Sequence, residues 1–138
     1  MITISRDYYF SAAHILPNHK GKCARLHGHN YRLVVTVRAS SLADKGSEEG
    51  MVIDFGNLDL IVKPIVAQLD HRFLARGDEW PFSGRPLSDD CCYVGVRTTA
   101  ENLAAWLGRW IGKELEPPVY LYKITLWETD RNCATWTP

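Results

Sequence analysis

The sequence has no excess of charge of either sign. Its 138 residues contain 16 Lys and Arg and 16 Asp and Glu, so the formal net charge at pH 7 is zero. Proteins that bind nucleic acid or anionic membrane surfaces usually carry a basic excess, because their field must attract phosphates. The balance therefore argues against both classes, although it still allows a local basic pocket.

Long hydrophobic segments are also absent. The chain has no apolar run of about 18 residues, the length expected of a transmembrane helix. Its first residues, MITISRDYYF, do not place an apolar run after a basic region, so we expect no signal peptide. The sequence also lacks repeats, low-complexity segments and linkers. We expect one domain spanning 1–138, outside any membrane.

Cysteine is scarce and has no metal or redox spacing. The four cysteines include the vicinal pair Cys91 and Cys92, which cannot bridge easily, and no C-x-x-C occurs. This usage indicates free thiols in a reducing compartment, and we expect a cytoplasmic protein.

The patterns that are present predict an α+β fold of order ββααββ with an antiparallel sheet. Strands are indicated by β-branched and aromatic residues, and helices by apolar residues at helical spacing. The predicted elements are strands at 2–14, 27–38, 119–128 and 133–137, and helices within 53–74 and 98–115.

Three local features qualify these elements. Pro64 lies inside the first helical pattern and predicts a kink or a late start. Thr98 and Glu101 have the spacing of a capping box at the start of the second helix. Residues 75–97 are rich in Pro, Gly, Ser and Asp and read as a long loop, a kind of segment that is often functional.

Histidines gather at the ends of the first two strands. His27 and His29 share a strand face with Tyr31, and His14 ends an apolar face of the first strand. If the two strands pair antiparallel, the three imidazoles converge and leave one coordination position open, which is typical of a catalytic zinc site. The alternative for H-x-H alone is two polar residues at a strand end. His19, in the loop, is interpreted as solvated or substrate-facing.

Cys23, Asp70 and His71 carry weaker signals. A thiol close to a dication loses its proton more easily and can act as a base or nucleophile, whereas a lone cysteine is more often buried and inert. A carboxylate beside an imidazole, as in Asp70-His71, can fix its tautomer. The alternative for that pair is a polar helix end.

Glu128 is a candidate ligand anchor. Alternation along the strand puts it on one face with Tyr120, Tyr122, Ile124 and Leu126. A carboxylate there can accept two hydrogen bonds from an amino–N–C–N–H edge, such as that of a guanidine or a pterin. A solvated acid beside the turn is the alternative.

Taken together, these motifs resemble the 6-pyruvoyl-tetrahydropterin synthase / 6-carboxytetrahydropterin synthase family. The stretches that carry the resemblance occur in family order between residues 10 and 129: FSAAH, CARLHGHNY, GMVIDFGNL, LDHRFL, TTAEN and LWET. The resemblance implies zinc ligands at His14, His27 and His29, a catalytic Cys23 with an Asp70-His71 pair, and a pterin-anchoring Glu128 with Thr99 and Glu101 near the pterin edge.

The resemblance also implies a fold, an assembly and a reaction. The family fold, the tunnelling fold or T-fold, is a four-stranded antiparallel sheet with two helices on one face. It assembles into an oligomeric barrel, usually a hexamer of two trimers whose subunits share active sites. The implied substrate is 7,8-dihydroneopterin triphosphate, and Lys20, Lys22 and Arg25 are candidates to meet the triphosphate, although a solvated basic loop is the alternative.

The spacing C-x-x-x-H-G-H, from Cys23 to His29, resembles the bacterial carboxy branch of the queuosine (7-deazaguanine) pathway. That branch releases acetaldehyde with triphosphate. The sequence departs from the family pattern at Pro64 and in the 75–97 loop, which matches no family stretch. Arg97 also stands where many relatives have a proline. The remaining alternatives are the pyruvoyl synthase, which keeps the side chain, and a non-catalytic zinc protein that only binds pterin.

Overall fold

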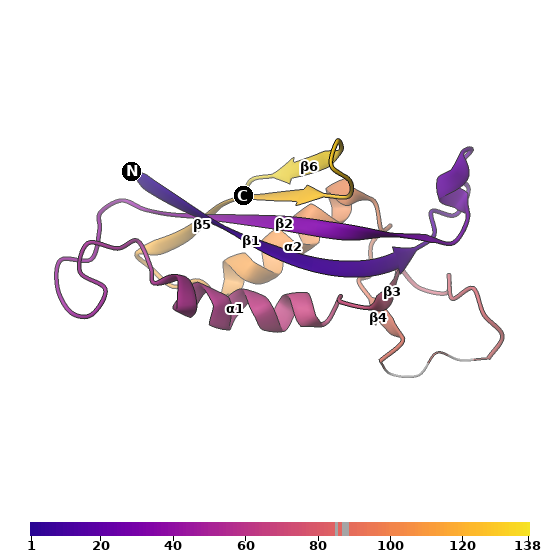
Figure 1. The fold of residues 1–138 in the computed structure, drawn as a ribbon, viewed down its shortest axis with the longest axis horizontal. Helices are drawn as coiled ribbons and strands as arrows, with labels where there is room; N and C mark the ends of the chain where they lie inside the picture. Colours follow the sequence, from indigo (N-terminus) through magenta and orange to yellow (C-terminus); the bar gives the residue numbers. More distant parts are fainter. Residues whose placement is uncertain (85, 87–88) are drawn as a thin grey trace.

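The chain folds into one curled sheet with two helices packed against the same face (Figure 1). The computed structural model describes residues 1–84, 86 and 89–138. In chain order the elements are β1 (Ile2–His14), β2 (His27–Ala39), α1 (Phe55–Ala67), β3 (Arg72–Ala75), β4 (Cys91–Tyr93), α2 (Ala100–Glu114), β5 (Val119–Trp127) and β6 (Cys133–Trp136), with a short 3-10 turn at Lys22–Ala24.

The two longest strands form the centre of the sheet. β1 and β2 pair antiparallel over their whole length, from Ile2 opposite Ala39 to His14 opposite His27. Their inward side chains are buried under the helices, and Phe10 stacks on Tyr31 with ring centroids 4.8 Å apart. This confirms the predicted antiparallel pairing, which places both histidine-bearing ends at the same end of the molecule.

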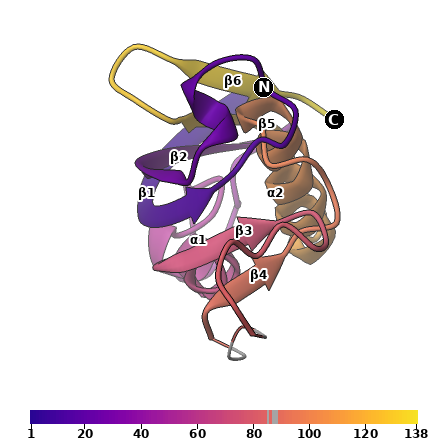
Figure 2. The ribbon, with the colours of Figure 1, turned by 90° about the vertical axis from the view of Figure 1, so that its right-hand side faces the viewer.

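The predicted four-stranded antiparallel sheet is wrong. The sheet has six strands in the order β4-β3-β1-β2-β5-β6, and it is mixed, because β3 runs parallel to β1 and β4 parallel to β3. The two additional strands have four and three residues, too short to show alternation in the sequence. β4 lies inside the predicted 75–97 loop, whose residues 85, 87 and 88 fall outside the described part of the chain. Viewed from the histidine end, the sheet curls around the helices (Figure 2).

The helices begin where short side chains cap them. Asp54 caps α1 by accepting a hydrogen bond from the Gly56 amide, so the predicted late start is wrong, and Pro64 falls in the last turn. α2 is capped by Thr99, which accepts from the Asn102 amide, and not by the predicted Thr98. Among the described residues, no helix is long and apolar enough to cross a membrane.

β5 does not alternate regularly, because it contains a bulge. Thr36 pairs with Lys123 and Val37 with Leu121, so Tyr122 has no partner in the register. The predicted common face of Tyr120 and Tyr122 with Ile124 is therefore wrong: both tyrosines are exposed, while Leu121 and Ile124 are buried. The bulge adds one residue and reverses the facing of the strand on its N-terminal side.

Candidate metal centre and substrate pocket

The three predicted histidines meet at the end of the β1–β2 pair. One nitrogen each of His14, His27 and His29 lies within 4.8 Å of the others. His14 is buried and the other two are half-buried. The register places His14 directly opposite His27, and His29 lies two residues further along the same face. Three imidazoles at one point, open on one side, can hold a metal ion.

The orientation of two rings favours a metal. His14 donates its Nδ1–H to the Thr98 carbonyl (2.8 Å), and His27 donates its Nδ1–H to the Arg25 carbonyl (2.7 Å). The opposite nitrogen, Nε2, of each ring is buried and has no partner. A buried acceptor is costly unless a donor or a metal ion binds it. Metal-bound histidines characteristically donate their second nitrogen in this way, so the residues fit a zinc ion.

Burial also keeps the histidines in the form that binds a metal. Burial lowers the pKa of His14 to about 4, with repulsion from His27 and His29 acting in the same direction and the Thr98 carbonyl opposing it. Burial, and then His27, lower the pKa of His29. Both imidazoles are therefore neutral near pH 7, with lone pairs free to coordinate.

The glycine of H-G-H is required by the close approach of the two strands. A Cβ at Gly28 would lie 2.8 Å from the backbone oxygen of Ala12, a distance no side chain tolerates. Gly28 faces away from the histidines, so its role is to let β1 and β2 come together where His14 meets His27. The glycine thus permits the close strand approach beside the three histidines.

A pocket of about 330 Å³ brings together the three residues assigned to substrate binding. Thr99 and Glu101, at the start of α2, line it together with Glu128, which directly follows β5. Burial, and then the charge of Glu101, raise the pKa of Glu128, while the nearby His27 acts against them. The pocket therefore holds a half-buried acceptor of hydrogen bonds within electrostatic reach of the histidine cluster.

Asp70 and His71 form a pair that is fixed to β1. The Asp70 carboxylate accepts from the Ser11 amide and from His71 Nδ1, both at 2.9 Å, and the His71 amide donates to the Ser11 carbonyl. The Ser11 amide, and then His71, hold the pKa of Asp70 below its usual range against the opposing effect of burial. His71 has φ of 57° and an 82% exposed side chain, so its free nitrogen faces outward.

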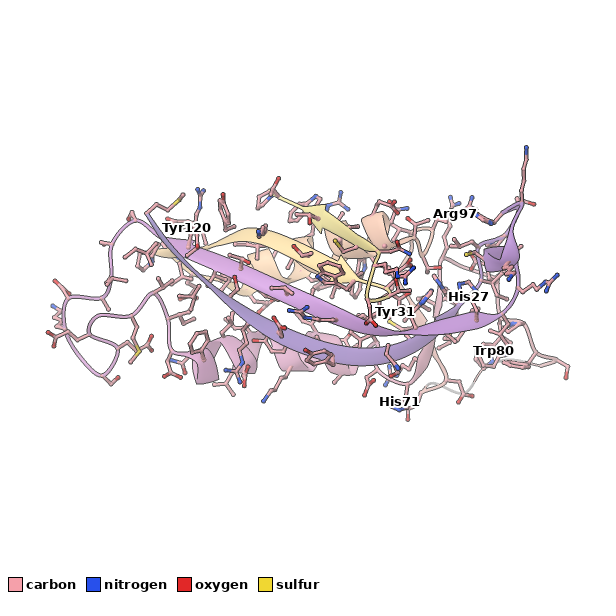
Figure 3. The ribbon with its side chains drawn as sticks, turned by 45° about the horizontal axis from the view of Figure 1, so that its top comes forward. His27, Tyr31, His71, Trp80, Arg97 and Tyr120 are labelled. Carbon is pink, nitrogen blue, oxygen red and sulfur yellow. The ribbon has the colours of Figure 1, made fainter. Side chains whose placement is uncertain are left out.

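In the described part of the chain, the predicted catalytic residues His71 and Cys23 do not line the same pocket. His71 lines a pocket of about 550 Å³ with His29, Trp80 and Phe82, and Cys23 is not among its lining residues. Figure 3 labels His27 and His71 at separate places toward the same end of the molecule. The histidine cluster thus borders the pocket of His71 through His29, whereas its link to Glu128 is the electrostatic effect of His27 on that carboxyl group.

Cys23 lies in the loop between β1 and β2. The 3-10 turn Lys22–Ala24 holds it, and its carbonyl accepts from the Leu16 amide at 2.9 Å. Its thiol is half-buried and free. The basic residues that are candidates for triphosphate binding are exposed in the same loop: Lys20, Lys22 and Arg25.

Sequence reasoning missed two residues that support the histidines. Thr98 is buried and supplies the carbonyl that orients His14. Tyr31 is fully buried, and its ring contacts His14 and His29 edge-on. A backbone acceptor leaves no signature in the sequence, but the shared face of Tyr31 with His29 was a usable signal.

Comparison with known proteins identifies the family. The family model described as 6-pyruvoyl tetrahydropterin synthase matches residues 3–138. The chain belongs to this family. The predicted resemblance is thereby confirmed over nearly its whole length.

Several members of the family are similar to this chain. The 6-carboxy-5,6,7,8-tetrahydropterin synthase of Haemophilus influenzae is 34% identical over 135 residues, which cover 94% of each chain. The protein of the same name from Synechocystis is 40% identical over 110 residues, covering 78% of this chain and 72% of that one. Among solved structures, the 6-pyruvoyl tetrahydropterin synthase of Caenorhabditis elegans has a TM-score of 0.74 at 28% identity, covering 99% of this chain and 95% of that one.

Proposed function

We propose that this protein is a zinc-dependent lyase that converts 7,8-dihydroneopterin triphosphate to 6-carboxy-5,6,7,8-tetrahydropterin, with release of acetaldehyde and triphosphate. One water is consumed, which balances the atoms of the reaction. The physiological setting that we propose is the queuosine (7-deazaguanine) pathway in the cytoplasm.

The observation that carries this proposal is the neighbourhood of the histidine cluster and the Glu128 pocket. Two orphaned Nε2 atoms converge with His29 at one point. The half-buried carboxylate of Glu128 is close enough for its charge to interact with His27. A ring bound by Glu128 would extend its substituent toward the metal, which is the arrangement that side-chain chemistry on a pterin requires.

The metal and the pocket would have separate tasks. Zinc held by His14, His27 and His29 would supply a Lewis acid and a template for the side-chain hydroxyls. Glu128 would accept the two N–H groups of the pterin ring, and Thr99 and Glu101 would line its edge. The ring would then be oriented before the chemistry begins, which lowers the entropic part of the barrier.

Proton transfer is assigned to Cys23, Asp70 and His71. Cys23 would remove a carbon-bound proton of the side chain, beginning tautomerisation and the loss of triphosphate. His71, oriented by Asp70, would relay protons. Positioned groups of this kind contribute roughly 10²–10⁴-fold each.

A site completed by another subunit is supported by the pocket of His71, whose lining residues do not include Cys23. We propose a homo-oligomer, a hexamer of two trimers, in which Asp70 and His71 act in a neighbour's site. The pocket beside His71 carries the exposed ring of Phe82. Exposed aromatic surface of this kind is typical of subunit contacts.

Product analysis distinguishes this function from its rivals. The purified protein would be incubated with 7,8-dihydroneopterin triphosphate, and products identified by mass, with Cys23→Ala as control. Acetaldehyde together with triphosphate is expected. The curated relatives named above favour this branch over the pyruvoyl synthase.

Other outcomes would decide against the carboxy branch. A product that keeps all three side-chain carbons, with triphosphate but no acetaldehyde, would indicate the pyruvoyl reaction. Tight pterin binding without release of triphosphate would indicate a non-catalytic binding protein.

A further inference from the structure

The pocket that contains Glu128 is lined by hydrogen-bond donors as well as by carboxylates. Besides the carboxylates of Glu101 and Glu128, its lining includes Arg97 and His19. Its volume of about 330 Å³ lies in the range of ligand sites, about 300–1,000 Å³. A ligand that fills it therefore meets hydrogen-bond acceptors from one set of residues and donors from another.

His19 is fixed as a donor. The Gly21 amide donates to His19 Nδ1 at 2.9 Å, so that nitrogen carries no proton and Nε2 carries it. The loop itself is closed by two backbone hydrogen bonds, from the Leu16 amide to the Cys23 carbonyl and from the His19 amide to the Leu16 carbonyl. The ring therefore offers an N–H group at the rim of the pocket.

The backbone of Arg97 is held in place by hydrogen bonds, and no carboxylate of the described residues forms an ion pair with its guanidinium. Its carbonyl accepts from the Thr99 amide (2.9 Å) and from Asn102 Nδ2 (3.0 Å), which fixes it at the start of α2. Within the described ranges, the Arg97 guanidinium makes no ion pair, although Glu101 and Glu128 line the same pocket. Figure 3 shows Arg97 and His27 at the same end of the molecule. The guanidinium is therefore available to a ligand.

We propose that Arg97 and His19 are specificity-determining residues that bind the ring carbonyl of the substrate while Glu128 binds its N–H groups. This inference rests on the proposed pterin function and adds to it a ligand class: heterocycles in which a carbonyl stands beside a ring N–H. A 4-oxopteridine presents this pattern, whereas a 2,4-diaminopteridine presents an amino group in place of the carbonyl. The N–H groups of Arg97 and His19 would face that amino group without an acceptor, which disfavours binding of the diamino compound.

The test compares two probes that differ at this position. Affinities of the zinc-loaded protein are measured for 6-hydroxymethylpterin and for 2,4-diamino-6-hydroxymethylpteridine. Because the probes also differ in protonation at the neighbouring nitrogen, the ratio of their affinities is compared between variants. In Arg97→Met, which keeps the aliphatic stem, the preference for the 4-oxo probe should fall about tenfold or more. Arg76→Met is the matched control, since Arg76 lines the adjacent pocket but not this one, and it should leave the ratio unchanged.

His19 allows a conservative pair of variants. His19→Gln keeps an N–H near the position of Nε2 and should retain most of the preference. His19→Asn keeps an acceptor for the Gly21 amide but loses the donor into the pocket, and should lose preference. A purely structural role of the ring would give the opposite order, because only Asn preserves the contact with Gly21.

The outcomes separate this inference from the proposed function. If Glu128→Gln weakens binding of the 4-oxo probe but Arg97→Met keeps the wild-type ratio, the inference fails and the pterin function stands. If Arg97→Met affects only triphosphate-bearing ligands, Arg97 contacts phosphate and the inference is wrong. If neither probe binds the wild-type protein, the proposed function fails together with the inference.

Discussion

Glu128 is placed where its charge opposes folding, so replacing it should change stability and binding in opposite directions. Burial, and then Glu101, raise the pKa of its carboxyl group. An acid whose pKa is raised by folding contributes stability that is fully present below its unfolded-state pKa and is lost as the pH rises through its folded-state pKa. At neutral pH the ionised carboxylate therefore destabilises the protein without metal or ligand.

Without metal or ligand, the Glu128→Gln protein should therefore be more stable than the wild type at pH 7. The difference should shrink as the pH is lowered toward and below about 4.3, the ordinary pKa of a glutamate, where both proteins are neutral at this position. Binding should change the other way. The amide keeps one acceptor and replaces the other with a donor, so it loses one charge-assisted hydrogen bond worth about 1.5–3 kcal/mol, or roughly 10- to 150-fold in Kd.

Two measurements check this. Thermal denaturation of the chelator-treated proteins at pH 7 and pH 4 gives the stability difference, and titration of the zinc-loaded proteins with 6-hydroxymethylpterin gives the affinities. Glu116→Gln, a change at an exposed acid, serves as the control and should alter neither. A Glu128→Gln protein that is less stable at pH 7, or that binds the pterin as tightly as the wild type, would refute the reasoning.

Three further predictions concern the metal and the thiol. The wild type should bind about one zinc per chain, and His14→Ala should lose most of it. Zinc binding should weaken on acidification through the imidazole range. Full zinc occupancy in a variant lacking all three histidines would exclude the site. Gly28→Ala should cost about 1–3 kcal/mol in unfolding free energy and weaken zinc binding, because the added Cβ would meet the Ala12 carbonyl at 2.8 Å; an unchanged melting temperature would contradict this. Cys23→Ala should keep zinc and pterin binding but lose roughly 10²–10⁴-fold in turnover. In the wild type, Cys23 should be alkylated faster than Cys133. Turnover retained by the Cys23→Ala protein would exclude a catalytic role of Cys23.

The sequence predicts most completely where a pattern repeats over many residues. β1 and β2 are thirteen residues long, and their patterns identify both as strands, which made an antiparallel pairing the natural hypothesis. The convergence of His14 with His27 is then a geometric consequence of antiparallel register. For this reason the candidate metal site could be predicted from the sequence once antiparallel pairing was assumed.

Prediction fails where a feature is short or resides in the backbone. β3 is held by pairing with β1, which is distant in sequence, and β4 is held by pairing with β3; the few residues of each strand show no period. The carbonyl of Thr98 orients His14, but every residue has a carbonyl, so sequence cannot mark this one. The start of α2 was likewise predicted one residue too early. Thr98 and Thr99 are adjacent and chemically alike, so the sequence does not show that Thr98 is buried and that Thr99 caps the helix.

The bulge in β5 explains how one strand can serve both the core and the pocket. From Ile124 onward, alternation places Leu126 and then Glu128 on the inner face, which directs the carboxylate to the pocket at the histidine end. A regular strand with that facing would also turn Tyr120 and Tyr122 inward, against the fully buried Val37 and its neighbours. The unpaired Tyr122 reverses the facing, so that Leu121 fills the core instead. Bulges often occur beside functional sites for this reason, because one inserted residue separates the requirements of packing from those of binding.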